Sequence, residues 1–108
     1  MEIKSINVKE LKRMRDENVN HVLIDVREQH EYDFANLGGE LVPVSLVPGN
    51  TDKFERETEM IIVHCRSGAR SANIIHQLQQ LKGIENMYNL EGGILAWSKE
   101  IDPSVPTY

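Results

Sequence analysis

The sequence predicts a single α/β domain built on a central parallel β-sheet of about five strands, with helices on both faces. Two apolar runs, 22–26 (V-L-I-D-V) and 60–63 (M-I-I-V), have the composition of strands that are covered on both sides. Helical patterns lie between and around these runs, and such alternation is typical of a parallel sheet with right-handed crossovers. The length of 108 residues suits one domain over 1–108, which includes a proline-containing tail from about residue 99.

The first helix is predicted over residues 8–17. Asn7 and Glu10 have the N-x-x-E spacing of a capping box, in which each side chain accepts a hydrogen bond from the backbone N–H of the other residue. Val8, Leu11 and Met14 then fall on one face of the helix. The pattern therefore indicates an amphipathic helix that packs on the sheet.

A second regular helix is predicted after the run 60–63. Its apolar positions recur at helical spacing, and they are Ile74, Ile75, Leu78 and Leu81. Gly83 follows where a helix would end in a left-handed cap, a conformation that glycine adopts without steric cost. Weaker patterns predict strands over 3–6, 41–44 and 87–90 and helices over 28–34, 52–55 and 94–101. Pro43 places its strand at a sheet edge or near the strand's own end, because proline donates no ladder hydrogen bond.

Composition and charge exclude several classes of function. The net charge of -5 argues against nucleic acid as a partner, because phosphate binding normally leaves a basic footprint. No run is long and apolar enough to predict a membrane span, and residues 1–7 lack the apolar core of a signal peptide. The single cysteine predicts neither an internal disulfide nor a structural zinc site, so a cytoplasmic location is expected. No metal site is predicted, because His21, His30 and His76 lack ligand spacing.

The chemistry is expected in residues 65–70 (C-R-S-G-A-R), which we call the cysteine loop. In an open parallel sheet, ligands bind beyond the carboxyl ends of the strands, and the segments predicted there are 25–28, 65–70 and 91–93. A strand-to-helix loop turns backbone N–H groups inward, and these groups with the helix N-terminus suit an anion such as a thiolate. Ser71 is expected to cap or open the following helix.

Within the cysteine loop, Cys65 is the candidate nucleophile, and the residues after it are the candidate anion cradle. The thiolate is the reactive form, and a helix N-terminus and nearby arginines favour it. Arg66 and Arg70 could also bind an oxyanion substrate through their guanidinium groups. The cradle consists of Arg66, Ser67, Gly68, Ala69 and Arg70. The alternative is a buried, unreactive cysteine at a strand end, beside two ordinary solvated arginines.

Asp25 and Arg27 lie at the end of the predicted strand 22–26 and should be near the cysteine loop. Asp25 could accept hydrogen bonds from the loop, and Arg27 could add positive potential; alternatively, the two form a structural ion pair. His64 should point away from Cys65, because adjacent strand residues point to opposite faces. Gly93 with its neighbour Gly92 should permit a close backbone approach, and Trp97 should pack the last helix on the sheet.

Three segments of the chain together resemble the rhodanese family of single-domain sulfurtransferases. They are L-I-D-V-R-E-Q-H-E-Y at 23–32, V-H-C-R-S-G-A-R-S-A at 63–72 and N-L-E-G-G-I-L-A-W at 89–97. The resemblance implies a rhodanese-like fold and a cycle in which Cys65 takes a sulfane sulfur from a donor such as thiosulfate. The resulting persulfide passes the sulfur to a thiophilic acceptor such as cyanide or a thiol, and no cofactor takes part.

Loop length bears on the chemistry that the resemblance implies. Family members close to protein phosphatases have a Cys-x-x-x-x-x-Arg loop, whereas four residues separate Cys65 from Arg70 here. The shorter loop favours sulfur transfer over phosphatase action. Two alternatives stay open beside the sulfurtransferase: a non-catalytic rhodanese-like interaction module and, less favoured, a phosphatase-like enzyme.

One segment departs from the pattern of the family. The usual G-H-I-P-G-A is A-N-L-G-G-E here, with Asn36 in place of the histidine. This variant and the ending I-D-P-S-V-P-T-Y resemble the C-terminal rhodanese domain of adenylyltransferase-sulfurtransferase fusions. That resemblance implies a ubiquitin-like sulfur-carrier protein as a further candidate acceptor.

Overall fold

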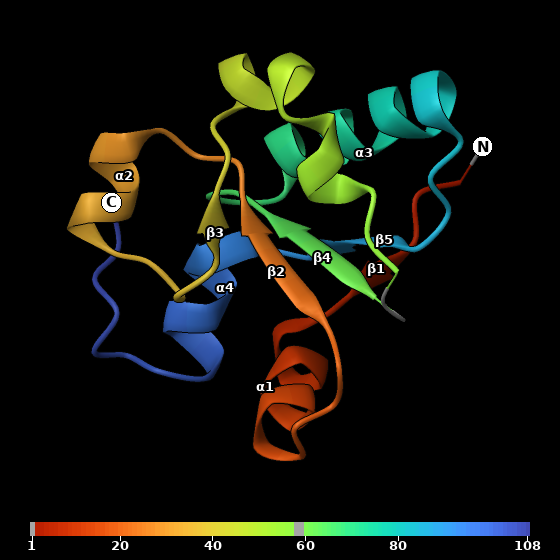
Figure 1. The fold of residues 1–108 in the computed structure, drawn as a ribbon. Coiled ribbons are helices and arrows are strands. Elements are labelled where there is room, and N and C mark those ends of the chain that lie inside the picture. Colours follow the sequence, from red (N-terminus) through yellow and green to blue (C-terminus); the bar gives the residue numbers. More distant parts are fainter. Residues whose placement is uncertain (1, 58–59) are drawn as a thin grey trace.

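The structure is a computed structural model that describes residues 2–57 and 60–108, and these residues form one parallel sheet (Figure 1). The strands, in chain order, are β1 (Ser5–Ile6), β2 (Val22–Asp25), β3 (Glu40–Leu41), β4 (Ile61–His64) and β5 (Met87–Leu90). Their spatial order is β1-β5-β4-β2-β3, and every pairing is parallel. The predicted sheet of about five parallel strands is therefore confirmed, with β3 at an edge as Pro43 indicated.

The helices are α1 (Val8–Asp16), α2 (Gln29–Phe34), α3 (Ala69–Lys82) and α4 (Gly93–Glu100), with 3-10 helices η1 (Val44–Gly49) and η2 (Thr51–Phe54). The capping box at the start of α1 is present, and the Glu10 N–H donates to Asn7 Oδ1 at 2.9 Å. Gly83 ends α3 with a φ of +66°, which is the predicted left-handed cap. Local sequence patterns thus place the start of α1 and the end of α3.

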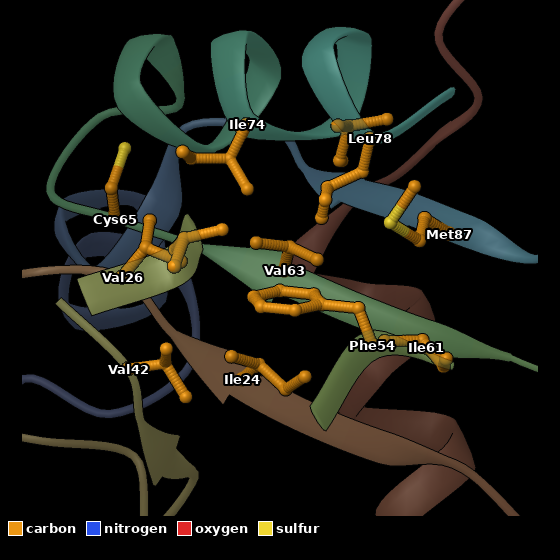
Figure 2. Close-up of a cluster of buried hydrophobic side chains, with 12 residues drawn as sticks. Ile24, Val26, Val42, Phe54, Ile61, Val63, Cys65, Ile74, Leu78 and Met87 are labelled. Carbon is orange, nitrogen blue, oxygen red and sulfur yellow. The ribbon is translucent and has the colours of Figure 1, made fainter. Parts of the chain in front are cut away.

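Two hydrophobic clusters cover the two faces of the sheet, because alternate strand residues point to opposite sides. On one face, α3 and the 3-10 helices pack on Ile24, Ile61 and Val63 (Figure 2). On the other face, α1, α4 and the tail pack on Leu23 and Ile62. Trp97 belongs to this second cluster, which confirms that it packs α4 on the sheet. Each fully buried aliphatic side chain contributes roughly 1.5–3 kcal/mol relative to an exposed one.

The structure corrects three sequence-based predictions. The strand predicted over 41–44 is Glu40–Leu41, and Val44 already begins η1, because Pro43 carries no N–H for the ladder. The helix predicted over 52–55 is the 3-10 helix Thr51–Phe54. Leu81, predicted on the packed face, is 78% exposed. Residues 80–83 are all exposed, so the packing of α3 ends before the helical pattern does.

Candidate active site

The cysteine loop connects β4 to α3. Cys65 follows the last residue of β4, and the main chain then turns at Gly68, whose φ is +113°. A residue with a Cβ is strained at this φ, so glycine is the residue that allows this turn. The helix α3 begins at Ala69 rather than at Ser71. Ala69 and Arg70, predicted in the loop, therefore lie in the first turn of α3.

Backbone hydrogen bonds join the start of α4 to the cysteine loop. The Ile94 N–H donates to the Cys65 carbonyl oxygen at 3.1 Å, and the Leu95 N–H donates to the Arg66 carbonyl oxygen at 3.2 Å. A Cβ added to Gly93 would lie 2.5 Å from each of these two oxygens, which confirms the close backbone approach predicted there. Because the first two loop carbonyls bind α4, the loop N–H groups are free to face the sulfur.

The sulfur of Cys65 lies in a cradle of hydrogen-bond donors at the N-terminus of α3. The Gly68 N–H donates to Sγ at 3.1 Å, and Ser71 Oγ lies 3.4 Å from Sγ. Burial opposes ionisation of the thiol, but hydrogen bonds from the Ser71 hydroxyl and from the N–H groups of Ser71, Gly68 and Ser67 outweigh it and lower the pKa of Cys65. The cradle therefore favours the thiolate, which is the nucleophilic form.

The Ser71 hydroxyl has one proton and three possible acceptors. Its oxygen lies 2.5 Å from Asn89 Oδ1, while the Asn89 side-chain amide donates to the Gly68 carbonyl oxygen at 3.2 Å. The Gly68 carbonyl oxygen also lies 3.2 Å from Ser71 Oγ, so the single Ser71 proton serves one of these three acceptors at a time. The Gly68 N–H, in contrast, donates to the sulfur.

Arg70 is bound by Glu31 of α2. Its Nη1 donates to Glu31 Oε1 at 2.7 Å and its Nη2 donates to Glu31 Oε2 at 2.9 Å, a forked pair. The hydrogen bonds from Arg70 hold the pKa of Glu31 well below its ordinary value, and those to Glu31 raise the pKa of Arg70. The charge of Cys65 also raises the pKa of Arg70, by less than Glu31 does.

Arg66 is bound by the tail. Its Nε donates to the main-chain oxygen of Tyr108 at 2.7 Å, its Nη2 donates to the same oxygen, and the guanidinium lies 5.1 Å from the centre of the Tyr108 ring. In Figure 1 the C-terminus lies beside α2. Tyr108 Oη there donates to Glu31 Oε2 at 2.6 Å. The two arginines predicted to bind a substrate anion are therefore linked to each other through Tyr108 and Glu31.

Asp25 and Arg27 form a fully buried ion pair. Arg27 Nη2 donates to Asp25 Oδ2 at 2.7 Å, and Arg27 also donates to the carbonyl oxygens of Glu31 and Ala35 and to Tyr108 Oη. Among the described residues, neither side chain has a hydrogen bond to residues 66–70. The geometry supports the structural alternative, in which the pair anchors α2 and the tail.

His64 lies on the face opposite to the sulfur. It is fully buried, its Nε2 lies 3.6 Å from Asp25 Oδ2, and Cys65 belongs to the cluster under α3. Burial lowers the pKa of His64 despite the nearby Asp25 carboxylate. The predicted orientation is confirmed, and His64 is no base for Cys65. Within residues 2–57 and 60–108, no group of three or more His, Cys, Asp or Glu side chains could hold a metal ion.

Sequence reasoning did not identify four side chains of this site: Glu31, Ser71 as a donor to sulfur, Asn89 and Tyr108. Asn89 offered one local signal, since it is a polar residue in the predicted strand 87–90. Glu31 and Tyr108 offered none, because one is a charged residue on a short helix and the other lies in an irregular tail. Only the folded chain brings them to the cysteine loop.

Comparison with known proteins gives one family for most of the chain: residues 7–100 match the rhodanese-like domain. The chain is 36% identical over 114 residues to the rhodanese-like/PpiC domain-containing protein 12, chloroplastic, of Arabidopsis thaliana, covering 98% of this chain and 38% of that protein. It is 30% identical over 122 residues to the adenylyltransferase and sulfurtransferase MOCS3 of Xenopus laevis, covering 95% of this chain and 27% of that protein. The chain thus spans well under half the length of these relatives.

Solved structures share the fold along the whole chain. A rhodanese-like domain protein from Staphylococcus aureus superposes with a TM-score of 0.79 at 30% identity, covering 98% of this chain and 99% of that chain. A rhodanese-related protein from Thermoplasma volcanium has a TM-score of 0.78 at 30% identity, covering 91% and 93% of the two chains. In the described part of this chain, no helix has the length and apolarity needed to span a membrane. The expected cytoplasmic location stays a prediction, and the Arabidopsis relative is named as chloroplastic.

Proposed function

Because the chain belongs to the rhodanese-like domain family, we propose that it is a sulfurtransferase in which Cys65 carries the transferred sulfur as a persulfide. Its relatives include sulfurtransferases. The observation that carries the proposal is the donation of the Gly68 N–H to Cys65 Sγ at 3.1 Å, at the N-terminus of α3. Such a cradle stabilises a sulfur anion before and after it gains a second sulfur.

With thiosulfate as the donor, the first half-reaction balances without a further reactant. The thiolate of Cys65 attacks the outer sulfur of thiosulfate, the sulfur–sulfur bond of thiosulfate breaks, and sulfite leaves with the electron pair. The product is a Cys65 persulfide anion. The loop N–H groups accommodate its charge, and the total charge of -3 is the same on both sides by this stoichiometry.

In the second half-reaction, a thiophilic acceptor attacks the outer sulfur of the persulfide. Cyanide, for example, leaves as thiocyanate and returns the Cys65 thiolate. A ubiquitin-like sulfur-carrier protein is a second proposed acceptor, supported by the similarity to the adenylyltransferase and sulfurtransferase proteins MOCS3 and MoeZ. No cofactor enters this scheme, because the cysteine itself carries the sulfur.

Mass spectrometry of the intact protein after incubation with thiosulfate tests the proposal. Cys65 is the only cysteine in the sequence, so a gain of one sulfur atom that cyanide reverses marks a persulfide at Cys65. The Cys65→Ser variant is the matched control and should gain nothing. If thiosulfate and a series of organic persulfides all left the wild-type mass unchanged, the catalytic proposal would be wrong.

One observation favours the second candidate function, a non-catalytic interaction module. Cys65 is only 1% exposed, and both loop arginines already have partners inside the protein. A non-catalytic module needs no access to the sulfur, whereas a sulfurtransferase must admit a donor. The mass measurement decides between the two, since the module would form no persulfide with any donor.

A further inference from the structure

The tail residue Tyr108 is anchored by several contacts of different kinds. Its hydroxyl accepts a hydrogen bond from Arg27 Nη1 at 2.9 Å and donates one to Glu31 Oε2 at 2.6 Å. Its ring meets Phe34 edge to face, with 5.8 Å between the ring centroids. Arg27 is fully buried and fixed by Asp25, so the tyrosine is bound to a rigid part of the domain. These contacts with Arg27, Glu31 and Phe34 fix the position of Tyr108 on the domain.

Anchored in this way, Tyr108 binds the guanidinium of Arg66. The main-chain oxygen of Tyr108 accepts from Arg66 Nε at 2.7 Å, and its ring lies under the guanidinium. The other arginine of the cysteine loop, Arg70, is bound by Glu31, which also accepts the Tyr108 hydroxyl hydrogen bond. Both cationic groups that could attract an anionic sulfur donor are therefore engaged within the chain.

These contacts leave little free positive charge at the cysteine loop. The side chains of Arg66 and Arg70 carry two positive charges and Glu31 carries one negative charge, so the three groups contribute a net charge of +1 (2 − 1). A dianion such as thiosulfate, which approaches the Cys65 thiolate, brings two more negative charges than a neutral donor does. A small dianion that binds the Nε/Nη2 edge of Arg66 must therefore displace the main-chain oxygen of Tyr108.

We propose that Tyr108 determines the donor selectivity of the site by competing with small dianions for Arg66. The inference rests on the proposed function, since it concerns which sulfur donors that site accepts. With a competing internal contact, the apparent affinity equals the intrinsic affinity multiplied by the fraction of molecules in which Arg66 is free. If about one tenth is free, the apparent affinity is about tenfold weaker. Donors of lower charge lose less, so the site favours monoanionic or neutral sulfane-sulfur compounds.

Direct binding tests the inference without any sulfur transfer. In the Cys65→Ser background, where no thiolate can react, thiosulfate binding is measured by titration calorimetry with and without Tyr108→Ala. We expect the Tyr108→Ala change to tighten thiosulfate binding about threefold to tenfold, the range for Arg66 free in a third to a tenth of molecules. Equal or weaker binding by the folded variant would overturn the inference.

Two further variants separate an effect through Arg66 from a general loosening of the fold. Tyr108→Phe keeps the ring contact with Phe34 but loses the two hydroxyl hydrogen bonds, so its thiosulfate affinity should lie between those of the parent and Tyr108→Ala. Tyr32→Phe is the control for loss of a phenol hydroxyl away from Arg66, because it removes the hydrogen bond to the Gly39 carbonyl oxygen. Adding Arg66→Ala should abolish the gain from Tyr108→Ala; a gain that persists without Arg66 contradicts the mechanism.

Kinetics in the chain with Cys65 give a second readout. Benzenethiosulfonate carries one charge rather than two, and it gives up its outer sulfur to the thiolate with benzenesulfinate as the leaving group. Tyr108→Ala should raise the ratio of kcat/KM for thiosulfate to kcat/KM for benzenethiosulfonate, through the KM for thiosulfate. An unchanged ratio refutes the selectivity role. If the protein transfers no sulfur but Tyr108→Ala still tightens thiosulfate binding, the proposed function fails and the competition for Arg66 stands.

Discussion

Replacing Gly93 by alanine should distort the cysteine loop at two of its carbonyl oxygens. Gly93 begins α4 with a φ of +57°, and a Cβ there would lie 2.5 Å from the carbonyl oxygens of Cys65 and Arg66. Neither oxygen belongs to a flexible side chain that could move aside. The loop itself must shift, and the hydrogen bonds from Ile94 and Leu95 to these oxygens are then stretched or lost.

The expected cost follows from these contacts. A residue with a Cβ in the left-handed region costs roughly 1–2 kcal/mol. Each of the two backbone hydrogen bonds contributes about 1 kcal/mol net to the free energy of unfolding. The Gly93→Ala change should therefore lower the free energy of unfolding by about 3–4 kcal/mol. The shifted N–H groups would also stabilise the thiolate less, so the pKa of Cys65 should rise.

The matched control is Gly83→Ala. Gly83 has a φ of +66°, but nothing lies within 4 Å of a Cβ added there, so only the backbone cost of roughly 1–2 kcal/mol applies. Urea denaturation measures the free energy of unfolding, and the pH dependence of Cys65 alkylation measures its pKa. If both variants lose the same free energy of unfolding, and Cys65 is alkylated with the same pH dependence in both, then α4 does not support the cysteine loop as inferred.

Three further predictions concern ionisable and polar groups around the loop. The pKa of Glu31 is lowered by Arg70, so its stabilisation is present above about pH 4.3 and lost on acidification. The stability gap between wild type and Glu31→Gln should shrink as the pH falls below that value in urea titrations, and a constant gap would contradict this. The Ser71→Ala change should raise the pKa of Cys65, because the thiolate loses the hydroxyl donor and keeps the backbone N–H donors. Rates of reaction with iodoacetamide against pH measure this pKa, and a lowered pKa would refute the cradle. Burial lowers the pKa of His64, so the unfolded state binds that proton first and stability falls as the pH drops below about 6.5. Thermal midpoints at about pH 8 and pH 5.5 should show this fall in the wild type and a smaller one in His64→Leu.

Much of the fold could be predicted from local patterns. The apolar runs at 22–26 and 60–63 became β2 and β4, and the capping box at Asn7 marks the start of α1. These patterns are predictive because the residues that a strand or helix buries are either adjacent in the sequence or one helical turn apart. The exposed Leu81 shows the limit of such patterns. Periodicity predicts which face of a helix is apolar, but not where along the helix the neighbouring elements stop covering that face.

The position of the cysteine loop was also readable from the sequence, but the partners of its arginines were not. A cysteine between a buried strand and a helix, followed by Gly68, predicts a turn of backbone N–H groups toward the sulfur. The contact of Arg70 with Glu31 joins residues 39 apart, and that of Arg66 with Tyr108 joins residues 42 apart. Sequence reasoning assigned both arginines to a substrate anion, whereas the structure gives both an internal partner.

What the sequence by itself determined is therefore the parallel α/β sheet and the place of Cys65 at the end of its central strand. What only the tertiary structure decided is the electrostatic state of the site: Glu31 neutralises Arg70 and Tyr108 engages Arg66. The physical reason is that burial patterns are local in the sequence, whereas the hydrogen-bond partners of the site are far apart in it. Burial periodicity repeats within a few residues, whereas hydrogen-bond partners from distant segments meet only after the chain has packed, and no local pattern specifies which of them meet.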